Sequence, residues 1–225
     1  MQKFSDVLCD KPRVDNSLPA KIIAPLFISI AVLCFCVRVL ARWQHGLRAS
    51  WRPDDWLIVP AVAGLVALFI VCHMVAYNGL GLDMWWLKPA EISYVLYWYF
   101  WAEIVYVWIV SWSKISVVTF YLQIFPNRRF RYANFLLIFC NVGYMIALIV
   151  VTVFQCDPVP GAWLAWDKLY QAKCVNINAV VWASALSSIV LDSAMLVLPM
   201  PMLWKLNMTT KKKLHVMFMF SLGLL

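Results

Sequence analysis

Apolar residues occur in five long runs, separated by shorter gaps that are rich in charged and polar residues. Each run reaches the roughly 20 residues that an α-helix needs to cross the hydrocarbon core of a bilayer. The runs are apolar on nearly all sides instead of alternating, which argues against a transmembrane barrel and favours helices that satisfy their own backbone hydrogen bonds. The pattern predicts membrane-spanning helices over residues 21–41, 55–77, 97–125, 132–155 and 176–204.

A sixth apolar run begins around Leu214 and reaches Leu225 after only about a dozen apolar residues, which is too short to span a membrane. We therefore expect the start of a sixth helix and a fold that is incomplete at its carboxyl end. Residues 1–20 contain no apolar core of signal-peptide length. We expect them to form an extracellular tail, followed by a membrane-spanning domain over residues 21–225.

Composition points to the same fold class. Of the 225 residues, 64% are apolar and only 13% are charged, and the mean hydropathy is +0.78. This leaves too little polar surface to cover a soluble globule of this size. Tryptophan residues gather near the predicted helix ends, where the amphipathic indole ring is stable at the membrane interface. The sequence therefore predicts an all-α, polytopic transmembrane helical bundle.

Basic residues alternate between the gaps. Eleven lie in or beside the first, third and fifth gaps, and three lie in the second and fourth. Because basic residues near the ends of membrane spans are retained in the cytosol, we expect the amino terminus to be outside. The formal net charge of +8 is accounted for by this topology and forms no continuous basic stripe, so we expect no nucleic-acid partner.

Three ionisable residues lie well inside the predicted helices: Glu103 and Lys114 in the third, and Asp192 in the fifth. A charge in hydrocarbon is costly, so each should face the bundle interior and find a partner. Lys114 and Asp192 both lie about 17 Å from the cytosolic ends of their helices, so we predict that they pair. Ser184 and Ser188 share a helix face with Asp192, and we expect all five residues to form an intramembrane polar network.

Two interpretations of the Lys114 and Asp192 pair remain open. The pair can fix helix packing and register, or it can take part in a ligand site or a conformational switch. Glu103 lies nearer the outer end of its helix, too far along the axis to touch Lys114, and we expect it to be open to a cavity or a ligand.

Cys156 and Cys174 bound the fourth gap, which the topology places outside the cell. An external loop is oxidising, so the sequence predicts a disulfide between them that stiffens a lid over the outer mouth of the bundle. Cys9 is also expected outside and could pair with either of them. The alternative that all three cysteines are reduced stays open.

A charge cluster is expected at the cytosolic helix ends. Asp54 and Asp55 open the second predicted helix, where carboxylates stabilise a helix amino terminus, and they can pair with Arg38 or Arg42. The sequence contains no nucleophile elbow, no paired-His metal motif, no phosphate-binding glycine loop and no zinc-type cysteine spacing. We therefore expect no catalytic residue, no metal site and no cofactor.

A series of short motifs occurs along nearly the whole chain, each of them once. They are Arg38 and Arg42 before Asp54-Asp55-Trp56, the turn Tyr77-Asn78-Gly79-Leu80-Gly81, Lys114-Ile115-Ser116 before Phe120-Tyr121-Leu122-Gln123-Ile124-Phe125, Gln155-Cys156-Asp157-Pro158 with Trp163 and Cys174, Asp192 before Leu198-Pro199-Met200-Pro201 and Trp204, and Lys213 before Phe220-Ser221-Leu222-Gly223. Together they resemble the fungal rhodopsin-domain integral membrane proteins, which include receptor-like proteins and the membrane protein of the satratoxin cluster.

The resemblance implies a seven-helix fold with an external amino terminus, of which the end of helix six and helix seven are absent from this chain. Many relatives have His after the glycine turn, where this chain has Asp83. In microbial rhodopsins the retinal-bearing lysine belongs to the last helix, whereas Lys114 belongs to the third. We therefore expect no chromophore.

Two functions follow as expectations. The first is a receptor-like sensor in the plasma membrane, rather than an internal membrane, that binds a small molecule or a surface ligand and meets a cytosolic signalling partner. The second is a transporter or an accessory membrane component of a secondary metabolic pathway, with Glu103, Lys114 and Asp192 along a substrate or proton path. In both cases the lipid bilayer is the main partner.

Overall fold

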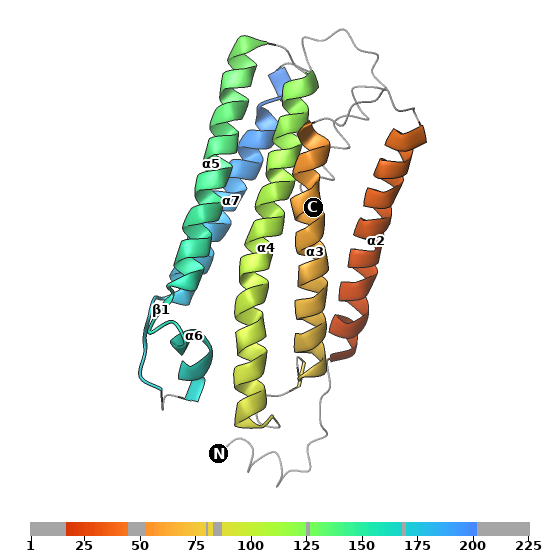
Figure 1. Ribbon diagram of the computed structural model, residues 1–225. Coiled ribbons are helices and arrows are strands. Elements are labelled where there is room, and N and C mark those ends of the chain that lie inside the picture. Colours follow the sequence, from red (N-terminus) through yellow and green to blue (C-terminus); the bar gives the residue numbers. More distant parts are fainter. Residues whose placement is uncertain are drawn as a thin grey trace.

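A computed structural model describes residues 17–44, 53–79, 81–82, 87–124, 127–167 and 170–201. Within these ranges five long helices stand side by side, as Figure 1 shows. Short elements connect the last two. The long helices are α2 (Ser17–Gln44), α3 (Pro53–Tyr77), α4 (Pro89–Ile124), α5 (Arg128–Val153) and α7 (Ile177–Val197), and the short elements are β1 (Cys156–Asp157), α6 (Gly161–Leu164), the 3-10 helix η2 (Ala165–Asp167) and β2 (Lys173–Cys174).

Four of the long helices are long and apolar enough to cross a membrane: α3, α4, α5 and α7. The prediction of an all-α membrane bundle is confirmed. In α2 the apolar stretch is shorter, Lys21–Val37, because basic residues bound it on both sides. Most of the expected amino-terminal tail and the start of the expected sixth helix at Leu214 lie outside the described residues.

Helix α4 begins eight residues before the predicted start at residue 97. The backbone N–H of Lys88 donates to Glu91 Oε2 at 2.9 Å, and Pro89 occupies the first helical position, where its missing N–H leaves no partner unsatisfied. At 1.5 Å per residue the 36 residues of α4 span about 54 Å, well beyond the roughly 30 Å of a hydrocarbon core. Helix α4 therefore projects past the other helices into the region of the connecting segments.

The ends of α5 and α7 follow from local chemistry. Asn127 Oδ1 accepts from the N–H of Arg129 at 3.1 Å, and Asn176 Oδ1 accepts from the N–H of Ala179 at 3.4 Å, so both helices begin at an asparagine cap. Helix α7 ends at Val197, before a turn that contains Pro199. The span was predicted to reach residue 204, but residues 202–204 lie outside the described residues.

Helix α4 lies at the centre of the bundle, with α3 on one side and α5 on the other (Figure 1). Helix α2 packs on α3, and α7 packs on α5. The α3 and α4 pair approaches closely at Gly64, where an added Cβ would lie 2.6 Å from Cγ1 of Ile109. Buried hydrophobic side chains of these two helices are Ala61, Val71, Val75, Ala76, Ile92, Phe100, Ile115, Val118 and Tyr121.

A small folded unit joins α5 to α7. Strands β1 and β2 pair antiparallel with Cys156 opposite Cys174, and the two cysteines form a disulfide. The α6 segment packs on α4, since the Trp163 ring lies 5.2 Å from that of Tyr97 and 5.5 Å from that of Phe100. We call the unit from β1 to β2 the hairpin; the sequence predicted its disulfide but not its strands or helical turns.

The two ends of the bundle differ in chemistry. At one end, uppermost in Figure 1, α2 and α4 stop and α3 and α5 start, and the first turn of α5 carries Arg128, Arg129 and Arg131. We call this the basic end. At the other end α3 stops, α4 starts and the hairpin lies, and we call this the hairpin end. The described helices therefore separate the arginine-rich turn of α5 from the disulfide by the full length of the bundle.

Candidate functional site

An ion pair joins α4 to α7 inside the bundle. Lys114 Nζ lies 2.8 Å from Asp192 Oδ1, and the two side chains are 11% and 29% exposed. Ser188, one turn before Asp192 on α7, completes the arrangement. Its hydroxyl accepts from Lys114 Nζ at 2.8 Å and donates to Asp192 Oδ2 at 3.3 Å. We call these three residues the ion-pair cluster.

The contacts within the ion-pair cluster offset the free-energy cost of placing charged side chains in the membrane. Both carboxylate oxygens of Asp192 have a partner, and the ammonium of Lys114 has two acceptors. A mutually satisfied pair is the form in which ionisable side chains persist at membrane depth. The equal depths of Lys114 and Asp192 that the sequence indicated are thus matched by direct contact in the structure.

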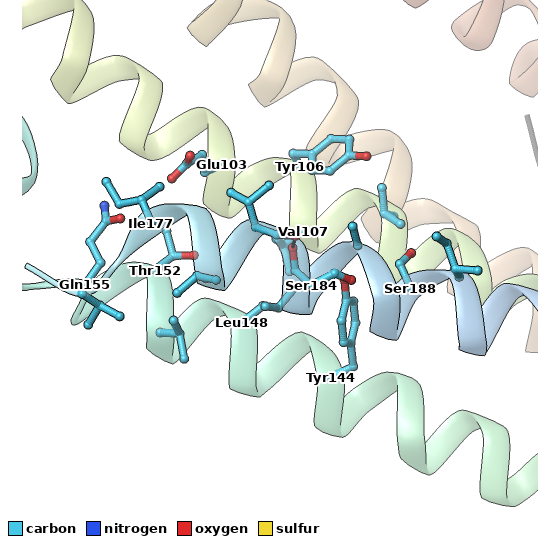
Figure 2. Close-up of a pocket in the computed structure, with 17 residues that line it drawn as sticks. Glu103, Tyr106, Val107, Tyr144, Leu148, Thr152, Gln155, Ile177, Ser184 and Ser188 are labelled. Carbon is cyan, nitrogen blue, oxygen red and sulfur yellow. Dashed lines mark hydrogen bonds between the residues drawn. The ribbon is translucent and has the colours of Figure 1, made fainter.

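A cavity of about 450 Å³ lies between α4, α5 and α7 (Figure 2). Seventeen residues line it, and most are aliphatic. Along α7 the lining extends from Ile177 to Ile189, which corresponds to about 18 Å at the rise of an α-helix. The polar members of the lining are Glu103, Tyr106, Tyr144, Thr152, Gln155, Ser184 and Ser188.

The cavity connects the hairpin to the ion-pair cluster. One extremity of the cavity lies next to the hairpin and is lined by Gln155, Val175 and Ile177. The other extremity is lined by Ser188. Because Ser188 bonds both Lys114 and Asp192, a change in its hydrogen bonding alters the contacts of both members of the ion pair. A molecule in this cavity would therefore contact the polar link between α4 and α7.

Tyr144 forms a second polar link, between α5 and α7. Its hydroxyl donates to the backbone carbonyl of Ser184 at 3.0 Å. The Ser184 hydroxyl instead donates to the carbonyl of Val181 within its own helix, at 2.8 Å. Of the five residues expected in one network, the structure brings Lys114, Ser188 and Asp192 together, whereas Ser184 is outside this cluster and its backbone carbonyl accepts from Tyr144.

Glu103 is separate from the ion-pair cluster. It lines the cavity near Gln155 and Ile177, at the extremity next to the hairpin (Figure 2). Within the described ranges its carboxylate has no hydrogen-bond or ion-pair partner. The side chain is only half-buried, as expected for a group that is open to a cavity.

The other predicted site residues fall into two groups. Cys156 and Cys174 form the disulfide of the hairpin, and Cys9 lies outside the described residues. The backbones of Arg38 and Arg42 belong to α2, and those of Asp54 and Asp55 belong to α3, but the side chains of these four residues lie outside the described part. The expected charge cluster at the helix ends therefore stays a prediction.

Among the described residues no three His, Cys, Asp or Glu side chains come together in a group that could hold a metal ion. His73, which is the imidazole within the described helices, lies between aromatic rings. Its ring centroid is 4.4 Å from that of Tyr77 and 5.9 Å from that of Phe69.

Four polar residues of the cavity were not among the site residues predicted from the sequence: Tyr106, Tyr144, Thr152 and Gln155. Each lies in a run of aliphatic and aromatic residues, where tyrosine is usual and draws no attention. A signal was present on α5, because Tyr144, Leu148 and Thr152 follow each other at intervals of four and so share one helix face. A weakly polar stripe on an otherwise apolar span is a pattern that could have located the cavity.

The family model of the fungal rhodopsin domain matches residues 37–225, which covers most of the chain. The chain belongs to the fungal rhodopsin-domain family. The resemblance inferred from the motifs is therefore confirmed, and the chain is an integral membrane protein of this family. No solved structure shows a significant match to it.

Several curated fungal proteins are similar to this family member. A SAT4 family membrane protein of Emericella nidulans is 31% identical over 126 residues, 55% of this chain and 32% of that protein. Fugralins biosynthesis cluster protein 2 of Gibberella zeae is 25% identical over 96% of this chain and 54% of its own length. Receptor GIN3 of Arthrobotrys oligospora is 25% identical over 90% of this chain and 49% of its own length. The chain thus spans about half the length, or less, of these relatives.

Proposed function

We propose that this chain forms part of a receptor-like sensor in the plasma membrane, and that a small molecule in the cavity acts on the ion-pair cluster. One observation carries the proposal: Ser188 lines the cavity and also bonds Lys114 and Asp192. The binding space and the polar link between two helices thus share a side chain. The similarity to a fungal protein named as a receptor supports the same function.

The proposal includes an orientation, with the amino terminus outside and the basic end in the cytosol. It is supported by the arginine-rich first turn of α5 at the basic end, because basic residues at helix ends are retained on the cytosolic side. The hairpin with its disulfide then lies in the oxidising exterior. In this orientation the basic end meets anionic lipid or an acidic cytosolic partner.

The proposed mechanism is a shift between two arrangements of α7. A ligand whose far end reaches Ser188 and turns its hydroxyl away, by bonding it or by filling the space beside it, removes one acceptor from Lys114 and one donor from Asp192. The ion pair then holds α7 to α4 less tightly, and α7 moves at the basic end. Such a ligand favours the moved state only by its difference in affinity for the two arrangements.

The test measures the distance between spin labels at the basic ends of α4 and α7, in the full-length protein in lipid nanodiscs with the free cysteines replaced. We expect Asp192→Asn and Ser188→Ala to lengthen and broaden this distance distribution. Ser187→Ala is the matched control, because the Ser187 hydroxyl donates to the Ala183 carbonyl of its own helix, at 2.8 Å, and to no other group in the part of the chain that the structure describes. An unchanged distribution in both cluster variants would contradict the sensor mechanism.

A second candidate function is that of a transporter or accessory membrane component in a secondary metabolic pathway. Relatives named as biosynthesis cluster proteins favour it, including Fugralins biosynthesis cluster protein 2 and Wortmanamides biosynthesis cluster protein C of Talaromyces wortmannii. Movement of a pathway product across sealed vesicles that contain the full-length protein would decide for transport. Ligand-dependent binding of a cytosolic partner, without such flux, would decide for the sensor.

A further inference from the structure

Two acidic side chains lie near opposite extremities of the cavity, Glu103 in its lining and Asp192 outside it. At one extremity Asp192 lies behind Ser188 and is neutralised by Lys114. At the other, the Glu103 carboxylate faces the cavity without a partner among the described residues. A carboxylate in a membrane-spanning helix is costly unless it is paired. Glu103 is therefore the group whose charge a bound molecule can complement.

The space between these two extremities is apolar. Val107 and Val110 of α4, Leu148 of α5, and Val180 and Ala185 of α7 line it. The lining extends for about 18 Å along α7, so the cavity is long in the direction of the helix axes. Sites of this kind take the apolar body of a ligand from the aliphatic walls and its orientation from a few polar groups.

We propose that the cavity binds an elongated amphiphile with a cationic amine head, in which the ammonium pairs with Glu103 and the aliphatic body extends toward Ser188. An anionic head of the same size is disfavoured, because it would meet the Glu103 charge at short range. A neutral alcohol gains the apolar contacts but not the charge-assisted hydrogen bond. This ligand class rests on the proposed function, since it names what the sensor would bind.

The test compares decylamine, decanol and decanoate, which share one chain and differ in head-group charge. Binding to the full chain in phosphatidylcholine nanodiscs is measured by titration calorimetry, with empty nanodiscs subtracted to remove partitioning into lipid. We expect affinity to fall from the amine to the alcohol to the carboxylate. Glu103→Gln should weaken decylamine binding by about tenfold or more and leave decanol binding unchanged.

Glu91→Gln is the matched control. Glu91 lies on the same helix, but its carboxylate bonds the N–H of Lys88 and does not line the cavity, so decylamine binding should be unchanged. Equal affinity for the three probes, or equal decylamine binding by Glu103→Gln, would overturn the proposal. Lys168, which lies outside the described residues, could instead neutralise Glu103. Decylamine binding that appears only in Lys168→Met would establish that internal pair and also overturn it.

The failure of this inference can be told from the failure of the sensor mechanism. If decylamine does not bind but Asp192→Asn still changes the distance between α4 and α7, the ligand class is wrong and the sensor mechanism stands. If decylamine binds through Glu103 but neither it nor Asp192→Asn changes that distance, the site stands and the sensor mechanism is wrong. The two measurements therefore separate binding at one extremity of the cavity from coupling at the other.

Discussion

Helices α3 and α7 are held to the bundle by different physical means. Helix α3 packs on α4 through shape, with a close approach at Gly64 and a hydrogen bond of 3.2 Å from Trp108 Nε1 to the Pro60 carbonyl. Of the most apolar stretch of α3, 22% is buried, against 6% for α7. Within the described residues α7 is held instead by the ion-pair cluster and by the hydrogen bond from Tyr144.

This difference matters because lipid provides little hydrophobic drive for helices to associate. Close packing of two helices has one best arrangement and resists small displacements. A helix held by a few polar groups can exchange those partners for others at similar depth. We infer that α3 with α4 is the rigid part of the described bundle, and that α7 is the part that the proposed ligand moves.

The largest effect is expected from breaking the ion-pair cluster. Asp192→Leu leaves Lys114, only 11% exposed, without its carboxylate, and should lower stability by about 3 kcal/mol. The measurement is unfolding by a denaturing detergent in mixed micelles. Lys114→Met should also lower stability, because it leaves the Asp192 carboxylate with the Ser188 hydroxyl as its partner among the described residues.

The double variant Lys114→Met with Asp192→Leu sharpens this prediction. Replacing both charges with apolar side chains removes the buried charge altogether, so most of the lost stability should return. Helix α7 should then be bound to α4 without any dependence on Ser188. If the double variant is as unstable as Asp192→Leu, the cluster does not act as a pair and α7 is held by packing, as α3 is.

The next effect is expected at the hairpin, which connects α7 to the rest of the bundle. The double substitution of Cys156 and Cys174 by Ser removes a disulfide between residues that are 18 positions apart. It should lower stability by about 2 kcal/mol. The value is modest because α5 and α7 remain inserted in the unfolded state. Cys140→Ser, at an exposed free thiol, is the control and should have no effect. Equal stability with and without reductant would contradict the prediction.

The rigid pair is tested by Gly64→Leu. The new side chain would collide with Ile109 and Trp108, so α3 and α4 must separate, at a cost of about 2 kcal/mol. Gly143→Leu is the control, because nothing lies within 4 Å of an added Cβ there and both changes gain the same helix propensity. Similar unfolding curves for the two variants would mean that close packing does not distinguish the α3 and α4 pair.

The helices and the ion pair could be predicted because each depends on few residues. The runs of apolar residues located five helices, and the depths of Lys114 and Asp192 along two helices located their contact. The start of α4 was missed because residues 89–96 are less apolar than the rest. The helix continues there through the cap at Lys88 and Glu91, outside the part that hydropathy detects.

The full lining of the cavity and the strands and helical turns of the hairpin could not be predicted, because both depend on how separate segments meet. Tyr144 and Val107 line the same space only because α5 and α4 are neighbours at one rotation about their axes. Trp163 reads in the sequence as a membrane-interface residue, yet it packs on Tyr97 of α4. The rotation of each helix about its axis decides which side chains meet. This rotation is set by packing between helices, and the pattern of apolar residues in one sequence does not predict it.

The smallest effect is expected from Tyr144→Phe, which removes the hydrogen bond to the Ser184 carbonyl and keeps the ring. Hydrogen bonds between membrane helices average about 0.6 kcal/mol, so unfolding should shift by about that amount. Tyr132→Phe is the control on the same helix, because the Tyr132 side chain is 76% exposed. A loss as large as that in Asp192→Leu would mean that α5, and not the ion pair to α4, fixes the position of α7. In that case a ligand that disturbs Ser188 would leave α7 in place. The contact that holds α7 to the bundle would then be the Tyr144 hydrogen bond and not the ion-pair cluster.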